Sequence, residues 1–181
     1  MKLVIERARF PGVLLIKPER FLDGRGSGSE LYKASELRRA GIRETFVQEN
    51  RSISRKGVLR GLHYQRAPYA QAKLVRCGRG RVFNAAVDLR RGSKTFGVSF
   101  CLTLSEAEGT MVYLPAGFAH GFLALTDGAE VLYKCSREFS AAHYGGLRWN
   151  DPQLGIKWPA KKPLLSAKDG ALPLLKEIKG I

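Results

Sequence analysis

The 181-residue sequence lacks the features that mark several large protein classes. Its three cysteines are an odd number without a CxxC pair, which predicts neither a disulfide framework nor a cysteine-bound zinc site. We interpret Cys77 and Cys135 as packing residues. No apolar run approaches the roughly 20 residues of a membrane-spanning helix, and charges and Pro11 interrupt the N-terminal apolar stretch before a signal-like core forms. We therefore expect a soluble, cytoplasmic protein with no membrane partner.

Acidic residues are also scarce, and this scarcity bears on the ligand. The chain has 16 Asp and Glu against 31 Lys and Arg, a formal net charge of +15, which predicts an acidic ligand or surface. The basic residues are scattered singly or in pairs, so the long basic run typical of nucleic-acid-binding tails is missing. The net charge does not itself choose among nucleic acid, membrane lipid and a phosphorylated metabolite, but the charge distribution leads us to expect no nucleic-acid partner.

Short segments with alternating or continuous apolar residues, each bounded by turn formers, dominate the rest of the chain. Regular turn signals between such segments predict a mainly β sandwich or barrel instead of βαβ units. The length suits one domain over residues 1–181. The predicted strands are 13–16, 82–89, 95–104, 111–114, 122–125 and 129–135.

Three other segments predict loops or helices instead of strands. Glycine and other turn formers crowd residues 17–30 and predict a loop, whereas 30–40 has helical spacing with a possible cap at Ser29. Residues from about 150 to 181 carry four prolines and should wrap as loops and short helices.

The stretch 58–75, VLRGLHYQRAPYAQAKLV, places reactive side chains on a predicted strand–loop–strand. An arginine can hold an anion, a histidine can move a proton near neutral pH, and a lysine can stabilise a negative oxygen. Here these residues are Arg60, His63 and Lys73. A reaction centre also needs an acid and a group that orients the base, and these must come from elsewhere in the chain.

A second motif, PAGFAH at 115–120, has the PxGxxH form of the second conserved box of cupin barrels. A metal-binding cupin also needs an earlier HxH followed by a carboxylate, but the corresponding place reads His63-Tyr64-Gln65. Two neutral imidazoles without a companion carboxylate make a poor site for zinc or iron. We expect no metal, and a metal-dependent cupin oxygenase is the weakest of the alternatives.

Taken together, several motifs carry a specific resemblance that runs from about Phe21 to Asp169. The sequence resembles the dTDP-4-dehydrorhamnose 3,5-epimerase family. The resemblance implies a cupin-like double-stranded β-helix (jelly-roll) barrel with a few short helices, a homodimer, no metal or other cofactor, and a nucleoside-diphosphate 4-keto-6-deoxy sugar as substrate. The matching motifs are VLRGLHYQ, QAKLV, VDLR, PAGFAHGF, VLYK and WNDPQLGIKWP.

The resemblance implies four catalytic residues. Inverting a carbon next to a ketone requires a base, a stabilised enolate and an acid on the opposite face. His63 matches the base, and Asp169 matches the carboxylate that orients it. Lys73 matches the cation beside the enolate oxygen, and Tyr133 matches the acid. The plainer interpretations are a core histidine, a core tyrosine, a solvated strand lysine and, for Asp169, a helix cap.

The resemblance also implies contacts to the substrate. Arginine binds phosphate oxygens in bidentate fashion, and Arg25 and Arg60 match positions that contact the diphosphate. Some of these contacts are expected across the dimer interface. The alternative is that Arg25, Glu30 and Lys168 are solvated surface charges. Gln48 and Asn50 would then only end a strand. The remaining matches are Glu30, Gln48, Asn50, His120 and Lys168.

Departures from the family pattern cluster at expected substrate contacts. Ser27-Gly28-Ser29 stands where aromatic residues are usual, Asn84 where an aspartate is common, and Phe139 where a tyrosine is usual. The segment 141–144 lacks a usual proline and glutamate. The sequence therefore leaves open a 3-epimerase or isomerase acting on another sugar nucleotide, and a cupin that binds a sugar nucleotide without turnover.

Overall fold

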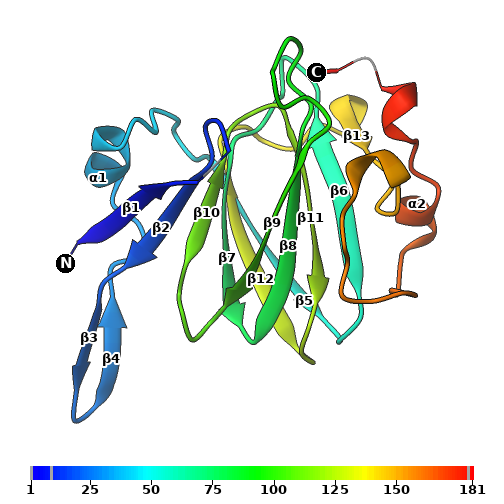
Figure 1. Cartoon of the computed structure of the whole chain (residues 1–181). Helices are drawn as coiled ribbons and strands as arrows, with labels where there is room; N and C mark the ends of the chain where they lie inside the picture. The colour runs from blue at the N-terminus through cyan, green and yellow to red at the C-terminus, as the bar shows by residue number, and fades with distance from the viewer. Residues whose placement is uncertain (1, 9, 179) are drawn as a thin grey trace.

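The computed structural model describes residues 2–8, 10–178 and 180–181, and within them two antiparallel sheets face each other (Figure 1). One sheet has the strand order β1 (Leu3–Arg7), β2 (Leu14–Pro18), β10 (Met111–Leu114), β7 (Lys73–Arg79), β12 (Ala129–Cys135) and β5 (Gln48–Ser54). The other has the order β13 (Tyr144–Gly146), β6 (Leu59–Gln65), β11 (Phe118–Ala124), β8 (Arg81–Asp88) and β9 (Ser99–Ser105).

The chain crosses repeatedly between the two sheets, from β6 to β7, from β7 to β8, and from β10 through β11 to β12. This alternation makes the jelly-roll barrel, so the predicted mainly β, cupin-like fold class is confirmed. The period of two in each strand then sends alternate side chains into the space between the sheets. Buried residues that meet there include Val75, Val82, Leu114, Phe122 and Val131.

The C-terminal tail covers the outer face of the second sheet (Figure 1). Leu147 and Leu154 pack there with Leu62, Ala85 and Val87. Strands β8 and β11 are therefore buried on both faces, which explains their nearly continuous apolar sequences. As predicted, the tail forms loops and short helices: η2 (Pro152–Leu154), α2 (Ala167–Gly170) and η3 (Leu175–Glu177), preceded by η1 (Ala141–His143).

The predicted loop over 17–30 is wrong. Strand β2 runs on to Pro18, and β3 (Arg20–Asp23) and β4 (Gly26–Ser29) form a two-stranded hairpin that projects from the sandwich (Figure 1). All residues of β3 are exposed, and β4 is exposed up to its last residue. Because neither strand has a buried face, the sequence shows no alternation there, and its glycines suggested only a turn.

The helix predicted over 30–40 is shorter, as α1 (Ala34–Arg39). Ser29 is not its cap: the N-cap is Lys33, which makes no side-chain capping bond. Leu37 is the buried residue of the helix, so little apolar burial is available to extend it. No helix among the described residues is long and apolar enough to cross a membrane.

The strand predictions differ in accuracy. The segments 111–114 and 129–135 are confirmed to the residue as β10 and β12. Strand β11 begins at Phe118, earlier than predicted, because glycine and alanine in PAGFAHGF hide its strand character. Strand β9 begins only at Ser99, because Thr95 belongs to a turn in which its hydroxyl donates to Asp88.

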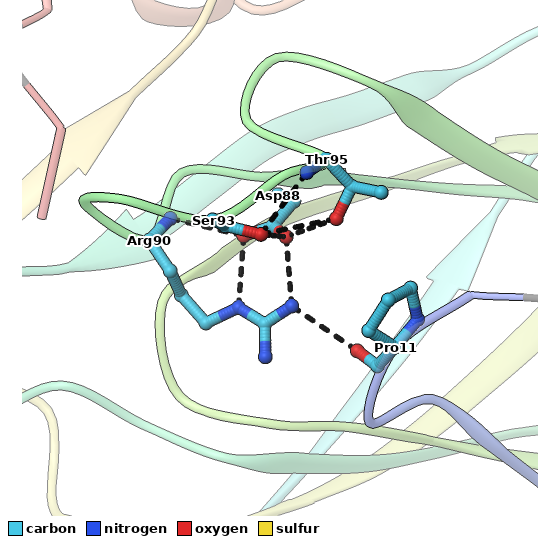
Figure 2. A network of polar contacts seen from close by, with 5 residues as sticks. All are labelled: Pro11, Asp88, Arg90, Ser93 and Thr95. Carbon is cyan, nitrogen blue, oxygen red and sulfur yellow. Dashed lines mark hydrogen bonds and ion pairs between the residues drawn. The ribbon is translucent and has the colours of Figure 1, made fainter.

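Asp88 organises that turn and ties it to the N-terminal segment (Figure 2). Its fully buried carboxylate accepts hydrogen bonds from the Arg90 guanidinium at 2.7 and 2.9 Å and from the hydroxyls of Ser93 and Thr95 at 2.6 and 2.7 Å. Arg90 donates further to the carbonyl of Pro11 at 3.1 Å. Burial alone would raise the pKa of Asp88, but these hydrogen bonds outweigh it and hold the pKa well below its usual range.

We predict that Asp88→Asn lowers the free energy of unfolding by about 3 kcal/mol at neutral pH, because it leaves buried donors without their charged acceptor. Since the folded pKa lies below the unfolded value near 3.9, the contribution is complete above about pH 4 and fades as the pH falls further. Urea unfolding at several pH values measures this. Asp23→Asn, at an exposed Asp–Arg pair, is the control and should leave the midpoint unchanged. An equal loss at low and neutral pH would contradict the prediction.

Candidate active site

A cavity of about 900 Å³ is lined by residues from both sheets and from the tail. It brings together nine of the eleven residues that the sequence singled out. Three catalytic candidates come from strands and the fourth, Asp169, comes from α2 in the tail. The nine are Gln48, Asn50, Arg60, His63, Lys73, His120, Tyr133, Lys168 and Asp169.

His63 and Asp169 form a close pair. Nε2 of His63 lies 2.6 Å from Oδ1 of Asp169. Burial raises the pKa of Asp169, but hydrogen bonds from His63, Ser166 and a backbone N–H outweigh it, so the net pKa is lowered. An ionised carboxylate can only accept, so Nε2 carries the proton and Nδ1 is left to take up another. Asp169 is not the helix cap of the plainer interpretation, because Ser166 caps α2 by accepting the Asp169 N–H.

Two glycines let the strands beneath this pair approach each other closely. Gly61 has φ +126°, and a Cβ there would lie 2.5 Å from the Cα of Gly121. A Cβ on Gly121 would in turn lie 2.7 Å from the Arg60 carbonyl oxygen. The RGLH and HGF sequences therefore permit β6 and β11 to pack with His63 opposite His120.

Lys73 is buried in the cavity wall, 7% exposed, so the solvated-lysine interpretation is wrong. Its Nζ donates to the carbonyl of His63 at 3.3 Å. Burial lowers the pKa of Lys73, and the neighbouring Cys135 thiol, which becomes negative on ionisation, partly opposes that shift. An ammonium held at such a place gains most when a negative oxygen comes beside it.

Tyr133 reaches the cavity from β12, on the sheet that faces the sheet of His63. Burial raises the pKa of Tyr133, so the phenol keeps its proton at neutral pH. Its ring lies edge-on to the ring of His120, with 6.4 Å between centroids. Part of the side chain packs against the main core, as the plainer interpretation expected, while part lines the cavity.

Gln48 and Asn50 are the first and third residues of β5, and both line the cavity. Gln48 Nε2 donates to Asn50 Oδ1 at 3.0 Å, and Gln48 Oε1 accepts the backbone N–H of Phe139 at 2.7 Å. The amides thus connect the strand to the segment after β12. Arg60 on β6 also lines the cavity, and its Nε donates to Ser54 Oγ at the other end of β5 at 3.1 Å.

Tyr144 is a cavity residue that the sequence did not single out. Its ring lies 5.3 Å from the His63 ring, and the ammonium of Lys168 stands 3.7 Å from the ring centroid. Burial and the neighbouring Asp169 carboxylate raise the pKa of Tyr144 to about 12. The short distance between the Lys168 ammonium and the Tyr144 ring is a cation–π contact, which holds Lys168 at the cavity. The only sequence signal was the departure at 141–144, where the proline and glutamate of the family pattern are missing.

Arg25 and Glu30 do not reach this cavity within one chain. Arg25 sits on the projecting hairpin with its side chain 91% exposed and paired with Asp23 at 2.6 Å. Glu30 follows the hairpin, 3.5 Å from the Lys33 ammonium. The predicted substrate contacts of Arg25 and Glu30 therefore stay predictions, because neither residue lines the cavity of its own chain. Within the described ranges, no group of three or more His, Cys, Asp or Glu side chains is arranged to hold a metal ion.

Comparison with known proteins agrees with this geometry. A family model described as dTDP-4-dehydrorhamnose 3,5-epimerase matches residues 7–177. The chain belongs to the dTDP-4-dehydrorhamnose 3,5-epimerase family. The dTDP-4-dehydrorhamnose 3,5-epimerase of Salmonella typhimurium is 47% identical over 177 residues, covering 97% of this chain and 96% of that protein.

Solved structures of epimerases are similar to this chain over nearly its whole length. A dTDP-6-deoxy-D-glucose-3,5-epimerase from Legionella pneumophila, in complex with dTDP-4-keto-L-rhamnose, has a TM-score of 0.94 and 40% identity, covering 98% of this chain and 95% of that one. ChmJ, a 3′-monoepimerase from Streptomyces bikiniensis in complex with dTDP-quinovose, has a TM-score of 0.88 and 36% identity, covering 93% and 86%. The epimerase family thus includes relatives that differ in the number of centres inverted.

We predict that the Lys73 ammonium titrates below 10.5, the ordinary lysine value, because burial disfavours its charged form. NMR of ¹⁵N-lysine-labelled protein, with the Lys73 signal identified by its loss in Lys73→Arg, measures the pKa directly. Binding of a dianionic nucleotide should raise this pKa. A Lys73 pKa at or above 10.5 in the free protein would contradict the prediction.

Proposed function

We propose that this protein is a cofactor-independent epimerase that inverts C3 and C5 of a nucleoside-diphosphate 4-keto-6-deoxyhexose. The substrate is dTDP-4-dehydro-6-deoxy-D-glucose and the product dTDP-4-dehydro-L-rhamnose. The carrying observation is the convergence of the His63–Asp169 pair, Lys73 and Tyr133 on one cavity, with the base candidate and the acid candidate on facing sheets.

His63 begins each inversion. The C4 ketone acidifies the hydrogens on C3 and C5, and the free Nδ1 of His63 removes one of them as a proton. The electron pair of the broken C–H bond moves into the ketone and forms an enolate. The new imidazolium is stabilised by the Asp169 carboxylate, which also keeps the ring in the required tautomer.

Lys73 stabilises the enolate oxygen. Among the described residues the ammonium has a single hydrogen-bond partner, the His63 carbonyl at 3.3 Å, and its pKa is lowered. The negative oxygen that forms during proton removal supplies the missing counter-charge, so the interaction is stronger in the transition state than with the neutral ketone.

Tyr133 completes the inversion by giving its phenolic proton to the same carbon from the other face. Its raised pKa keeps the proton available at neutral pH, and the enolate electron pair forms the new C–H bond while the ketone returns. The tyrosinate then regains a proton from solvent and the imidazolium loses one. Protons and charge balance over the cycle, so no cofactor is needed.

The cavity suits a diphosphate ester. Arg55, Arg60, Lys73 and Lys168 line it, and Asp169, already paired with His63, is its one acidic residue among those that the structure describes. Guanidinium groups bind phosphate oxygens in bidentate fashion. We assign Arg60 and Lys168 to the phosphates, and Gln48, Asn50 and His120 to polar groups of the sugar nucleotide.

We further propose a cytoplasmic homodimer built from one domain over residues 1–181. Three free cysteines fit a reducing compartment. The positions of the exposed Arg25 and the partly buried Glu30 fit a contact to the substrate in the other subunit, since neither reaches the cavity of its own chain. The hairpin that carries Arg25 is the element we assign to that contact.

A 3-epimerase is the second candidate, favoured by the similarity to ChmJ and by the unusual residues Phe139 and Tyr144 at the cavity. Both reactions use the same base, acid and enolate cation. They differ in whether C5 of the sugar, as well as C3, is brought to the base. The position of solvent exchange therefore separates them.

We predict that the purified protein, incubated with dTDP-4-dehydro-6-deoxy-D-glucose in heavy water, incorporates deuterium at both C3 and C5, as read by NMR. Incorporation at C3 alone would establish the 3-epimerase instead. If neither position exchanged, the epimerase proposal would fail, and a binding cupin without turnover would remain.

Variants assign the roles in the same experiment. His63→Ala should slow exchange at least about 100-fold, the usual lower contribution of a general base, while Tyr133→Phe should permit some exchange with little inversion. His143→Ala is the control, because His143 bonds Ser140 at 2.8 Å and lies outside the cavity lining. Full activity of His63→Ala would remove His63 as the base.

Mixing two impaired variants, with activity measured at substrate concentrations below the wild-type KM, tests whether Arg25 acts across the dimer. Arg25→Ala should raise KM by roughly tenfold or more through lost phosphate contacts. If one subunit's Arg25 serves the other's cavity, randomly mixed dimers of Arg25→Ala and His63→Ala regain about a quarter of the wild-type sites, since closed dimers are symmetric. Absence of recovery in confirmed mixed dimers would place Arg25 in its own subunit's site or outside any site.

A further inference from the structure

Asn84 lies directly behind the cavity wall. It is on β8, fully buried, and stands opposite Phe122 of β11 and Leu102 of β9 in the sheet. It does not line the cavity itself, but His120, its hydrogen-bond partner, does. Asn84 therefore reaches the ligand only through the ring of His120.

The hydrogen bond fixes which ring nitrogen carries the proton. Nε2 of His120 lies 2.8 Å from Oδ1 of Asn84, and an amide oxygen can only accept. Nε2 is therefore the protonated nitrogen. The amide nitrogen of Asn84 is buried without a partner in the described chain, so only the oxygen of this side chain is in use.

The ring itself is neutral. Burial lowers the pKa of His120 well below 6.5, and the Lys73 ammonium, together with His63 whenever that ring is protonated, lowers it further. The groups that face the ring from the other strands are Lys73 on β7, His63 on β6 and Tyr133 on β12, none of which carries a negative charge at neutral pH that would favour the imidazolium. A neutral ring with its proton on Nε2 has a lone pair on Nδ1.

That lone pair is available to a ligand. Nδ1 has no hydrogen-bond partner among the described residues and is not among the fully buried unpaired atoms, while the ring lines the cavity. An acceptor at this point selects a donor. In a nucleoside-diphosphate hexose, the phosphate oxygens and the C4 ketone only accept, whereas the hydroxyl groups can donate.

We infer that Asn84 is a positioning residue that holds His120 as a neutral ring with its proton on Nε2, so that Nδ1 accepts a hydrogen bond from a hydroxyl group of the sugar. The identity of this hydroxyl donor rests on the proposed function, whereas the state of the ring does not. The two cavity neighbours then divide the sugar's polar groups between them: Lys73 takes a carbonyl or enolate oxygen and His120 takes a hydroxyl.

The difference between asparagine and aspartate is central to this inference. A carboxylate at position 84 would accept the same Nε2–H but would also stabilise the imidazolium, in which both ring nitrogens donate. His120 would then cease to be an acceptor whenever it is protonated. The neutral amide keeps the hydrogen bond while withholding the charge.

NMR of the whole ¹⁵N-histidine-labelled protein without ligand tests the ring state. His63→Asn and His143→Asn each remove one set of signals and leave those of His120. We expect a protonated Nε2, a bare Nδ1 and no titration of His120 between about pH 5 and 8. In Asn84→Asp, His120 should titrate within that window, while Asn150→Asp, the same change at an exposed position, should leave it unaltered.

A proton on Nδ1, or titration of His120 in the wild type within that window, would overturn the inference. Because the wild-type spectrum decides this alone, a variant that fails to fold does not remove the test. Deuterium exchange into the sugar is measured separately, so failure of the proposed function leaves the ring state standing.

Kinetics test the acceptor role. Asn84→Leu should raise KM by roughly three- to tenfold, the value of one hydrogen bond, with a smaller change in kcat. Asn84→Asp retains the acceptor oxygen, so its KM should match the wild type at high pH and rise relative to it as His120 becomes protonated. Equal KM values for all three proteins across the pH range would refute a role for Nδ1 in binding.

Discussion

The hydrogen bond between His63 and Asp169 is the interaction on which the proposed chemistry depends. It joins residues 106 positions apart, one on β6 of the second sheet and one in the tail. The tail is held by apolar packing of Leu147 and Leu154 against the outer face of that sheet, not by the hydrogen bond itself. The geometry of the base is thus set by core packing on the far side of the strand that carries it.

The charge states of the cavity follow from where each group is buried. Asp169 stays ionised because donors surround it, Tyr133 stays protonated because it is desolvated, and His120 stays neutral for the same reason. Lys73 is a buried cation with no carboxylate partner in the described part of the chain, and it is placed to gain from a negative oxygen. A chain with a net charge of +15 also draws an anionic sugar nucleotide toward such a cavity.

The sequence predicted what local patterns encode and missed what tertiary contacts create. Alternation located β12, a short apolar segment bounded by turn formers located β10, and the motif resemblance named nine residues that the fold gathers into one cavity. The hairpin β3–β4 was not predicted because neither of its strands has a buried face that would produce alternation. Tyr144 escaped because its position beside His63 depends on β13 joining β6, a pairing of three residues with no periodic signal.

The origin of Asp169 in the tail has a consequence for biosynthesis. As the chain leaves the ribosome, His63 appears 106 residues before its partner, an interval of about 5 to 20 s at ordinary rates of translation. During that time the outer face of the second sheet lacks its cover and the histidine lacks its carboxylate. The nascent barrel therefore exposes apolar surface and lacks a complete catalytic base at the same time. Docking of the tail ends both conditions.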